Sequence, residues 1–371
     1  MGKNGYPVLD IHLENIYSNA KTIVEICEKK GITVSGVIKG AAGNKKVAEQ
    51  MLKAGCRQIA SSRIKQLAAA KKHLICETLL LRLPMKNEIA EVVKHADISL
   101  NSELDTVRQI EKACEVQGKK HRVILMVDLG DLREGYMDVE ETIAAAVFIE
   151  RHMKHVELAG IGTNLGCYGS VKPTVQNLGL LSEIAVEIEK QINRQLEFVS
   201  GGATTTLPLV LNDTIPRKIN HLRIGEGILI NMDLPILWNI NIPGLNQDTF
   251  ILKAQIIELK NKPSHPIGEL FVDAFGNKPV YEDSGIRKRA LLAIGAQDFV
   301  MHDKLVPQES GIRMVGSSSD HLIVDLTECS REYKVGDLIP FRMFYAPMLF
   351  LNSSSYVRKR LVRKSAIIGS K

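Results

Sequence analysis

Residues 33–44 read TVSGVIKGAAGN, a short run of β-branched and small residues that ends in a lysine and a glycine-containing turn. The run predicts a strand over 33–38, and the residues after it predict a turn into a helix. The turn carries no GxGxxG pattern, which a doubly wound sheet with a dinucleotide site would need after its first strand. The stretch therefore disfavours that open sheet.

Seven further strand-like runs follow this first one. They lie at 57–60, 78–81, 97–100, 123–127, 158–162, 196–199 and 219–224. The segments between them have helical period: Leu181, Ile184 and Ile188, for example, recur at three- and four-residue steps. Eight alternating strand–helix units in about 225 residues predict an α/β fold, a (β/α)8 (TIM) barrel.

The sequence changes character after the eighth unit. The full length of 371 residues indicates two domains at about 150 residues each. Residues 234–250 hold the only tryptophan and no helical period, which indicates a crossing between domains. Strand-like runs then lie at 250–260, 268–275, 289–299, 312–328 and 337–345. We predict a barrel domain over 1–232 and a C-terminal all-β domain over 233–371, which a strand at 8–11 could join.

Composition excludes several classes of protein. Hydrophobic residues make up 45% and charged residues 24%, which excludes disorder and disulfide-rich scaffolds. The net charge of +6 is small and scattered, so we expect no nucleic-acid partner, and the basic run 358–364 is expected to be a solvated end. No secretory signal and no apolar run of about 20 residues is present, so we expect no membrane association. Six cysteines without a CxxC pair indicate reduced thiols in a cytoplasmic protein.

In an eight-stranded barrel, the active site lies on the loops after the carboxyl ends of the strands. Those loops place Lys39 after the first strand, Arg133 after the fifth, Asn164 after the sixth and Arg223 at the eighth. A lysine at the barrel mouth is partly desolvated, which lowers its pKa and suits its amine to Schiff-base chemistry. The alternative for Lys39 alone is an ordinary surface lysine.

Two glycine-rich turns favour the reactive over the ordinary interpretation of Lys39. SGGATTT (200–206) and RIGEG (223–227) expose backbone N–H groups where barrels commonly bind phosphate. We therefore assign Ser200 and Gly202 to the cofactor site. A reactive lysine facing a phosphate site is what pyridoxal 5′-phosphate requires.

The two arginines then acquire roles. Arg133 could meet the phenolate oxygen of that cofactor or a substrate carboxylate, and Arg223 could meet its pyridine nitrogen. A guanidinium does not give up its proton, so the ring nitrogen would stay unprotonated and the ring would be a weaker electron sink. Such a site favours brief proton removal and return at Cα. Salt bridges at the barrel rim are the alternative for both arginines.

The order and spacing of several short motifs resemble those of the alanine racemase superfamily, the fold-type III pyridoxal phosphate enzymes, and within it the ornithine racemase-like amino-acid racemases. The motifs are VIKG (37–40), DLGDLREG (128–135), GIGTNLGCYG (160–169), VSGGATTT (199–206), HLRIGEG (221–227), AIGAQD (293–298), GSSSDHLIVDLT (316–327) and YKVGDLI (333–339). The resemblance covers most of the chain. It implies a cofactor-binding barrel with a β domain, and a head-to-tail homodimer in which the β domain completes the partner's active site.

Residue roles follow from the resemblance position by position. Lys39 matches the Schiff-base lysine, Arg223 the arginine at the pyridine nitrogen and Arg133 the residue beside the phenolate oxygen. Asn164 stands where the family has an imidazole near the ring. Thr204, Gly225 and Glu226 (through its backbone N–H) match phosphate ligands. Ser319, just before Asp320, matches the backbone donor that meets the substrate carboxylate.

The sequence departs from the family at two positions. Gly43 replaces a tyrosine that contacts the phosphate, and Ala296 replaces the tyrosine of a GYxD turn that serves as the second catalytic base. Another group must then act on the opposite face of the substrate. The candidates are Asp298, which could equally cap its turn, Tyr345, Cys329 and Tyr168.

The leading hypothesis is a pyridoxal phosphate-dependent amino-acid racemase that uses two-base proton transfer at Cα. The resemblance favours ornithine or another basic amino acid, whose terminal ammonium would need a carboxylate such as Glu134, Asp298 or Asp320. A related lyase, similar to D-threonine aldolase or D-serine dehydratase, would need a metal pair.

His321 with Asp325 or Cys329 does not match a known spacing for that metal pair. The paired His152 and His155 indicate a solvated helix end, and no zinc motif is present, so we expect no metal site. A decarboxylase is disfavoured because that branch has a carboxylate where Arg223 stands. A non-catalytic cofactor-binding protein of this superfamily would be a bare barrel, shorter than this chain.

Overall fold

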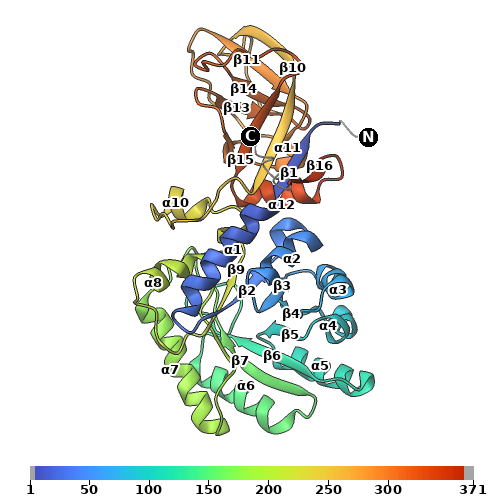
Figure 1. The fold of residues 1–371 in the computed structure, drawn as a ribbon, viewed down its shortest axis with the longest axis vertical. Helices are drawn as coiled ribbons and strands as arrows, with labels where there is room; N and C mark the ends of the chain where they lie inside the picture. Colours follow the sequence, from blue (N-terminus) through green and yellow to red (C-terminus); the bar gives the residue numbers. More distant parts are fainter. Residues whose placement is uncertain (1–4, 363–371) are drawn as a thin grey trace, which may run out of the picture. The chain divides into compact units, whose positions relative to one another are not determined.

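The computed structural model describes residues 5–362, which form two compact units (Figure 1). One unit spans Ile16–Leu245, and the other joins the described residues up to Asn15 to those from Asn246 onward. Residues 233–245 therefore belong to the unit that contains the barrel. They include a short helix, α10 (Asp233–Leu237), where the sequence predicted only a crossing segment.

Eight parallel strands close into a barrel, which confirms the predicted fold class. Each strand pairs with the next, and the last pairs with the first, so the sheet has no free edge. The strands are β2 (Thr33–Val37), β3 (Gln58–Ser61), β4 (Glu77–Leu80), β5 (Ile98–Asn101), β6 (His121–Met126), β7 (Val156–Gly162), β8 (Phe198–Ser200) and β9 (His221–Ile224).

Helices surround this barrel because their apolar residues recur on one face. In α1 (Leu13–Glu28), the side chains of Ile16, Ala20 and Ile23 are fully buried. Besides α10, the other α-helices of this unit are α2 (Lys45–Lys53), α3 (Ile64–His73), α4 (Ile89–His95), α5 (Leu104–Gln117), α6 (Val139–His152), α7 (Val175–Ile192), α8 (Leu207–Leu211) and α9 (Glu226–Leu229). Side chains at the amino ends fix where α2, α6 and α7 begin, namely Asn44, Asp138 and Thr174.

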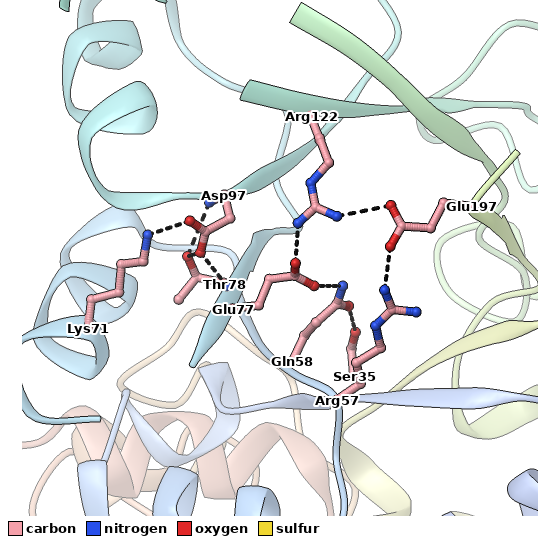
Figure 2. A network of polar contacts seen from close by, with 9 residues as sticks. All are labelled: Ser35, Arg57, Gln58, Lys71, Glu77, Thr78, Asp97, Arg122 and Glu197. Atoms are coloured by element: carbon pink, nitrogen blue, oxygen red, sulfur yellow. Dashed lines mark hydrogen bonds and ion pairs between the residues drawn. The ribbon is translucent and has the colours of Figure 1, made fainter. Parts of the chain in front are cut away.

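Polar side chains join the amino ends of the barrel strands in a network that we call the base network (Figure 2). The Ser35 hydroxyl donates to Gln58, and Gln58 donates to the Glu77 carboxylate. Arg122 then pairs with Glu77 and, at 2.9 Å, with Glu197. A cluster of buried apolar side chains drawn from β2–β8 packs together in the barrel. The barrel is thus a packed core, with its polar chemistry at the two ends.

The second unit is built on a sheet of mainly antiparallel strands, and the sequence predicted a β domain here. Its sheet runs in the order β12-β15-β10-β11-β14-β13, and β1 (Val8–His12) pairs with β10 and β16. The remaining bounds are β10 (Phe250–Pro263), β11 (Ile286–Leu292), β12 (Leu305–Pro307), β13 (Arg313–Ser317), β14 (Leu322–Asp325), β15 (Leu338–Met343), β16 (Arg358–Val362), α11 (Ala296–Phe299) and α12 (Tyr345–Ser353).

Three local predictions are wrong. The basic run near the C-terminus is no solvated end: residues 358–362 form β16, and Arg360 pairs with the buried Asp10 at 2.6 Å. Arg363 and Lys364 of that run lie outside the described residues. The run 268–275 forms no strand, because Phe271 and its apolar neighbours find no surface to pack against. Residues 296–299 form a helical turn rather than the end of a strand.

No helix within residues 5–362 has the length and apolar character needed to span a bilayer.

Candidate active site

Lys39 lies directly after β2, at the start of a 3-10 turn (Lys39–Ala41). The turn is fixed by backbone hydrogen bonds in which the Ile38 carbonyl accepts from Ala41 and Gly43, both at 3.1 Å. The side chain is half-buried, and burial lowers the pKa of its amine. Two nearby arginines lower this pKa further, while Cys167 and Glu134 oppose them. The environment therefore shifts the amine toward its uncharged, nucleophilic form.

Arg223 projects from β9 and is only 3% exposed. One terminal nitrogen donates to the Thr163 carbonyl and, at 3.0 Å, to the Asn164 side-chain oxygen. The other lies 3.9 Å from the Met126 sulfur. Burial lowers the pKa of Arg223 to about 10, so the guanidinium still carries its charge at neutral pH. Within residues 5–362, its Nε–H donates no hydrogen bond and its charge has no direct carboxylate partner.

Glu134 connects the second arginine to this group. The Arg133 Nε and a terminal nitrogen both donate to the Glu134 carboxylate, the latter at 2.6 Å. The same carboxylate accepts from the Asn164 side-chain nitrogen. A continuous chain of hydrogen bonds thus runs from Arg133 through Glu134 and Asn164 to Arg223. The sequence predicted these residues at the barrel mouth but not the part that Glu134 plays in joining them.

The loops after β6 and β7 are held together by a buried carboxylate that the sequence reasoning missed. Asp131 is 1% exposed and accepts backbone N–H bonds from Tyr168 at 3.0 Å and Val171 at 3.2 Å. Gly135 has φ +135°, and a Cβ there would lie 2.4 Å from the Asp128 nitrogen, so the position requires glycine. These contacts place Arg133 on an ordered loop.

The turns after β8 and β9 are also joined to each other. The Thr204 hydroxyl accepts from the Gly227 backbone N–H at 3.1 Å. The backbone N–H groups of Thr204, Gly225 and Glu226 donate to no other residue within 5–362, so they are available to an anion. Gly202 has φ +108°, a conformation that side-chain-bearing residues rarely adopt.

Ser200 and Glu226 direct their side chains away from these free donors. The Ser200 hydroxyl is fully buried and lies 2.8 Å from the His221 ring inside the barrel. The Glu226 carboxylate accepts from the backbone of Met232 at 2.6 Å and of Asp233 at 2.9 Å. Burial, aided by the nearby Asp233 carboxyl, raises the pKa of Glu226 to about 7. At Glu226, therefore, only the backbone suits a phosphate.

The remaining site candidates lie in the other unit. Asp298 is 4% exposed and accepts from the Ser354 hydroxyl at 2.6 Å, while Tyr345 is the half-buried first residue of α12. Ser319 and Asp320 are exposed, and the Ser319 hydroxyl donates to Asp320 at 2.8 Å. A Cβ on Gly295 would lie 2.0 Å from the Ser319 oxygen, so these two turns touch.

Metal ligands are absent from the part of the chain that the structure describes: no three His, Cys, Asp or Glu side chains come together there. Asp325 is held instead by Arg287 at 2.7 Å. His155 lies 2.9 Å from the Glu111 carboxylate.

Residues 11–231 match the family model described as alanine racemase, N-terminal domain. The chain belongs to the alanine racemase family. Among its relatives, an ornithine racemase of Acetoanaerobium sticklandii is 44% identical over 96% of this chain and 100% of the relative. A lysine racemase of Thermotoga maritima is 39% identical over 95% of this chain and 98% of the relative.

A solved family member supports the fold. The alanine racemase of Bartonella henselae, in a structure with covalently bound pyridoxal phosphate, aligns with a TM-score of 0.71 at 17% identity, over 96% of this chain and 100% of that one. At this identity the likeness shows the architecture, a barrel with a second domain, and nothing finer.

Proposed function

We propose that this family member is a pyridoxal 5′-phosphate-dependent racemase of a basic amino acid, ornithine or lysine. The observation that carries the proposal is the pairing of a half-buried Lys39 amine of lowered pKa with a buried Arg223 that has an unused donor. The names of the two long relatives support the reaction type and the substrate class.

The described residues fit this cofactor. Lys39 supplies the amine for an aldehyde, and the Nε–H of Arg223 suits a ring nitrogen that accepts. The free backbone donors of Thr204, Gly225 and Glu226 suit the phosphate, and Gly202 lets the turn beside them adopt a conformation that other residues rarely adopt. When bound, pyridoxal phosphate acidifies the Cα–H of an amino acid joined to its aldehyde.

The protein's part is to orient the reactants and to move a proton at Cα. Lys39 is the base on one face, and burial, which lowers the pKa of its amine, shifts it toward the uncharged form that a base requires. Arg223 donates a hydrogen bond but retains its proton, since a pKa of about 10 lies well above neutral. This keeps the ring nitrogen unprotonated, which favours prompt return of the proton over side reactions. Arg133 is placed to meet a carboxylate or phenolate oxygen.

For the opposite face we propose Tyr345 ahead of Asp298. One oxygen of the Asp298 carboxyl is already bonded to Ser354, as a structural residue would be. Tyr345 has a phenol, the type of group that Ala296 lacks. We also propose the Ser319 backbone and Asp320 as contacts of the substrate.

These groups belong to the β domain, so we infer a head-to-tail homodimer in which one subunit serves the barrel of the other. Sedimentation analysis should give twice the chain mass. A monomer that retains full activity would contradict the arrangement. The reduced cysteines fit an enzyme of the cytoplasm.

Two other functions have less support. A metal-assisted lyase would need a ligand pair in the β domain, and Asp325, one candidate for that pair, is held by Arg287 instead. A cofactor-binding protein without turnover would not require the second unit, and both long relatives are named racemases over their whole length.

The test is Cα–H exchange in D2O with the protein and pyridoxal phosphate. We expect deuterium at Cα of ornithine or lysine, together with the opposite enantiomer, and much less exchange with alanine. Cleavage products would indicate a lyase. Bound cofactor without exchange would indicate a binding protein, and either result would overturn the proposal.

A further inference from the structure

Glu134 is the carboxylate that lies between the two arginines of the site. Its side chain is 11% exposed, and both of its oxygens accept hydrogen bonds from Arg133. One of the two also accepts from Asn164. Arg133 and Arg223 carry like charges. Both lower the pKa of Lys39, and Arg133 also lowers the pKa of Arg223, whereas Glu134 acts to raise both pKa values. Glu134 therefore offsets the repulsion that two cations in one site would cause.

The hydrogen-bonding types fix how Asn164 is turned. A guanidinium only donates, so Arg223 must face the amide oxygen of Asn164. An ionised carboxylate only accepts, so Glu134 must face the amide nitrogen. Asn164 thus transmits the position of Glu134 to Arg223, although Glu134 does not touch Arg223.

This arrangement bears on an alternative role for Glu134, as the acceptor for the terminal ammonium of a basic substrate. Its oxygens already hold three N–H donors. A substrate ammonium would have to compete with a two-point guanidinium contact, which is a strong and directional pairing.

We propose that Glu134 is a positioning residue that holds the Arg133 guanidinium directly and the Arg223 guanidinium through Asn164, and that this role does not depend on a terminal ammonium in the substrate. The inference rests on the proposed function, because it assigns the two arginines to the cofactor and the substrate.

The test is Glu134→Gln, compared with Glu150→Gln as a matched control. Glu150 makes the same two-point contact with Arg194, at 2.7 and 2.6 Å, and it is not among the residues that we place in the site. In either orientation, a glutamine at 134 directs its NH2 group at a donor of Arg133 or Asn164. It therefore removes the charge and at least one hydrogen bond from Arg133 without changing the side-chain volume.

Exchange at Cα is measured with ornithine and with norvaline, which lacks only the terminal amine. We expect Glu134→Gln to lower kcat by the same factor for both, about 10- to 100-fold, with a smaller change in KM. Glu150→Gln should leave both values near wild type. A loss confined to ornithine and expressed in KM would make Glu134 the ammonium acceptor and overturn the proposal, as would an unchanged kcat.

Two further measurements separate positioning from a general loss of stability. A crystal structure of cofactor-free Glu134→Gln should show the Arg133 guanidinium displaced, and an unmoved guanidinium would contradict the proposal. This readout holds even if the wild-type protein shows no exchange, the result that would refute the proposed function.

The double variant Glu134→Gln with Asn164→Asp returns one negative charge to the space between the arginines. We expect it to be less impaired than the product of the two single losses, and a purely multiplicative loss would count against positioning.

Discussion

At the scale of single residues, charge and burial explain why the site carries so many titratable groups with a shifted pKa. Glu226 is an example of a shifted pKa in a side chain to which we give no part in the reaction. Its carboxyl anchors the segment after α9 through two backbone N–H groups, and burial raises its pKa to about 7. In the unfolded chain the same group has an ordinary, lower pKa.

Stability should therefore fall as the pH rises through the pKa of folded Glu226. The folded protein binds a proton that the unfolded chain releases at lower pH, so the contribution is fully present below about pH 4.5 and lost by about pH 7. Glu226→Gln keeps the acceptor and cannot ionise. We expect this variant to raise the free energy of unfolding by about 1–3 kcal/mol at pH 8 and to change it little at pH 4.5. Urea unfolding at both pH values is the measurement, and an equal effect at both would contradict the assignment.

Some residues of the candidate site could be predicted from the sequence and others could not, for a physical reason. Lys39, Arg133 and Arg223 could be predicted because each follows or ends a strand of the barrel, and strand ends converge on one face. The role of Glu134 could not, because its contact with Asn164 depends on how two loops 30 residues apart fold together. Asp131 was missed because nothing in its sequence context shows that the next loop would direct three backbone N–H groups at it.

At the scale of elements, the eight barrel strands could be predicted because short apolar runs alternate along the chain with segments of helical period. A closed parallel sheet buries both faces of every strand, so its strands are mostly apolar. The second unit was harder to predict. In β16 the sequence RKRLV is mostly basic, and only its pairing with β1 and the contact of Arg360 with Asp10 make it a strand. Residues 268–275 show the reverse: an apolar run without a neighbouring strand stays irregular.

The base network of the barrel (Figure 2) should affect stability and leave the chemistry alone, because it joins the amino ends of the strands, whereas the candidate site follows their carboxyl ends. Arg122→Met removes the cation shared by Glu77 and Glu197 and leaves two partly buried carboxylates without that partner. We expect a loss of about 1–3 kcal/mol in the free energy of unfolding, with kcat within twofold of wild type. Denaturant unfolding and steady-state exchange test the two halves of this prediction. A large fall in kcat with unchanged stability would show that the two ends of the barrel are coupled.

At the scale of the whole molecule, the first and last described strands lie side by side. Strands β1 and β16 are parallel neighbours, and Asp10, which is 1% exposed, accepts two hydrogen bonds from Arg360 and lies 3.0 Å from Lys253. Burial opposes the charge of Asp10, yet the contacts from Arg360 and Lys253 outweigh it and lower the pKa of this carboxyl. Strands β1 and β16, which are far apart in the sequence, therefore complete the second unit together.

Arg360→Leu should destabilise the second unit by about 1–3 kcal/mol, because it leaves the buried Asp10 charge with Lys253 alone. The contribution of Asp10 is present above its unfolded pKa and is lost as the pH falls through its lowered folded value. The difference between wild type and variant should accordingly shrink in acid. Thermal unfolding at pH 7 and pH 3 measures it, and a difference independent of pH would contradict the ion-pair account.

The central claim is that the Lys39 amine captures the aldehyde of pyridoxal phosphate. The most direct measurement is borohydride reduction of the protein mixed with the cofactor, followed by peptide mapping. We predict a single pyridoxyl group on Lys39, and its loss, together with the visible absorbance band, in Lys39→Ala. A label on another lysine, or an unchanged spectrum in the variant, would contradict the account.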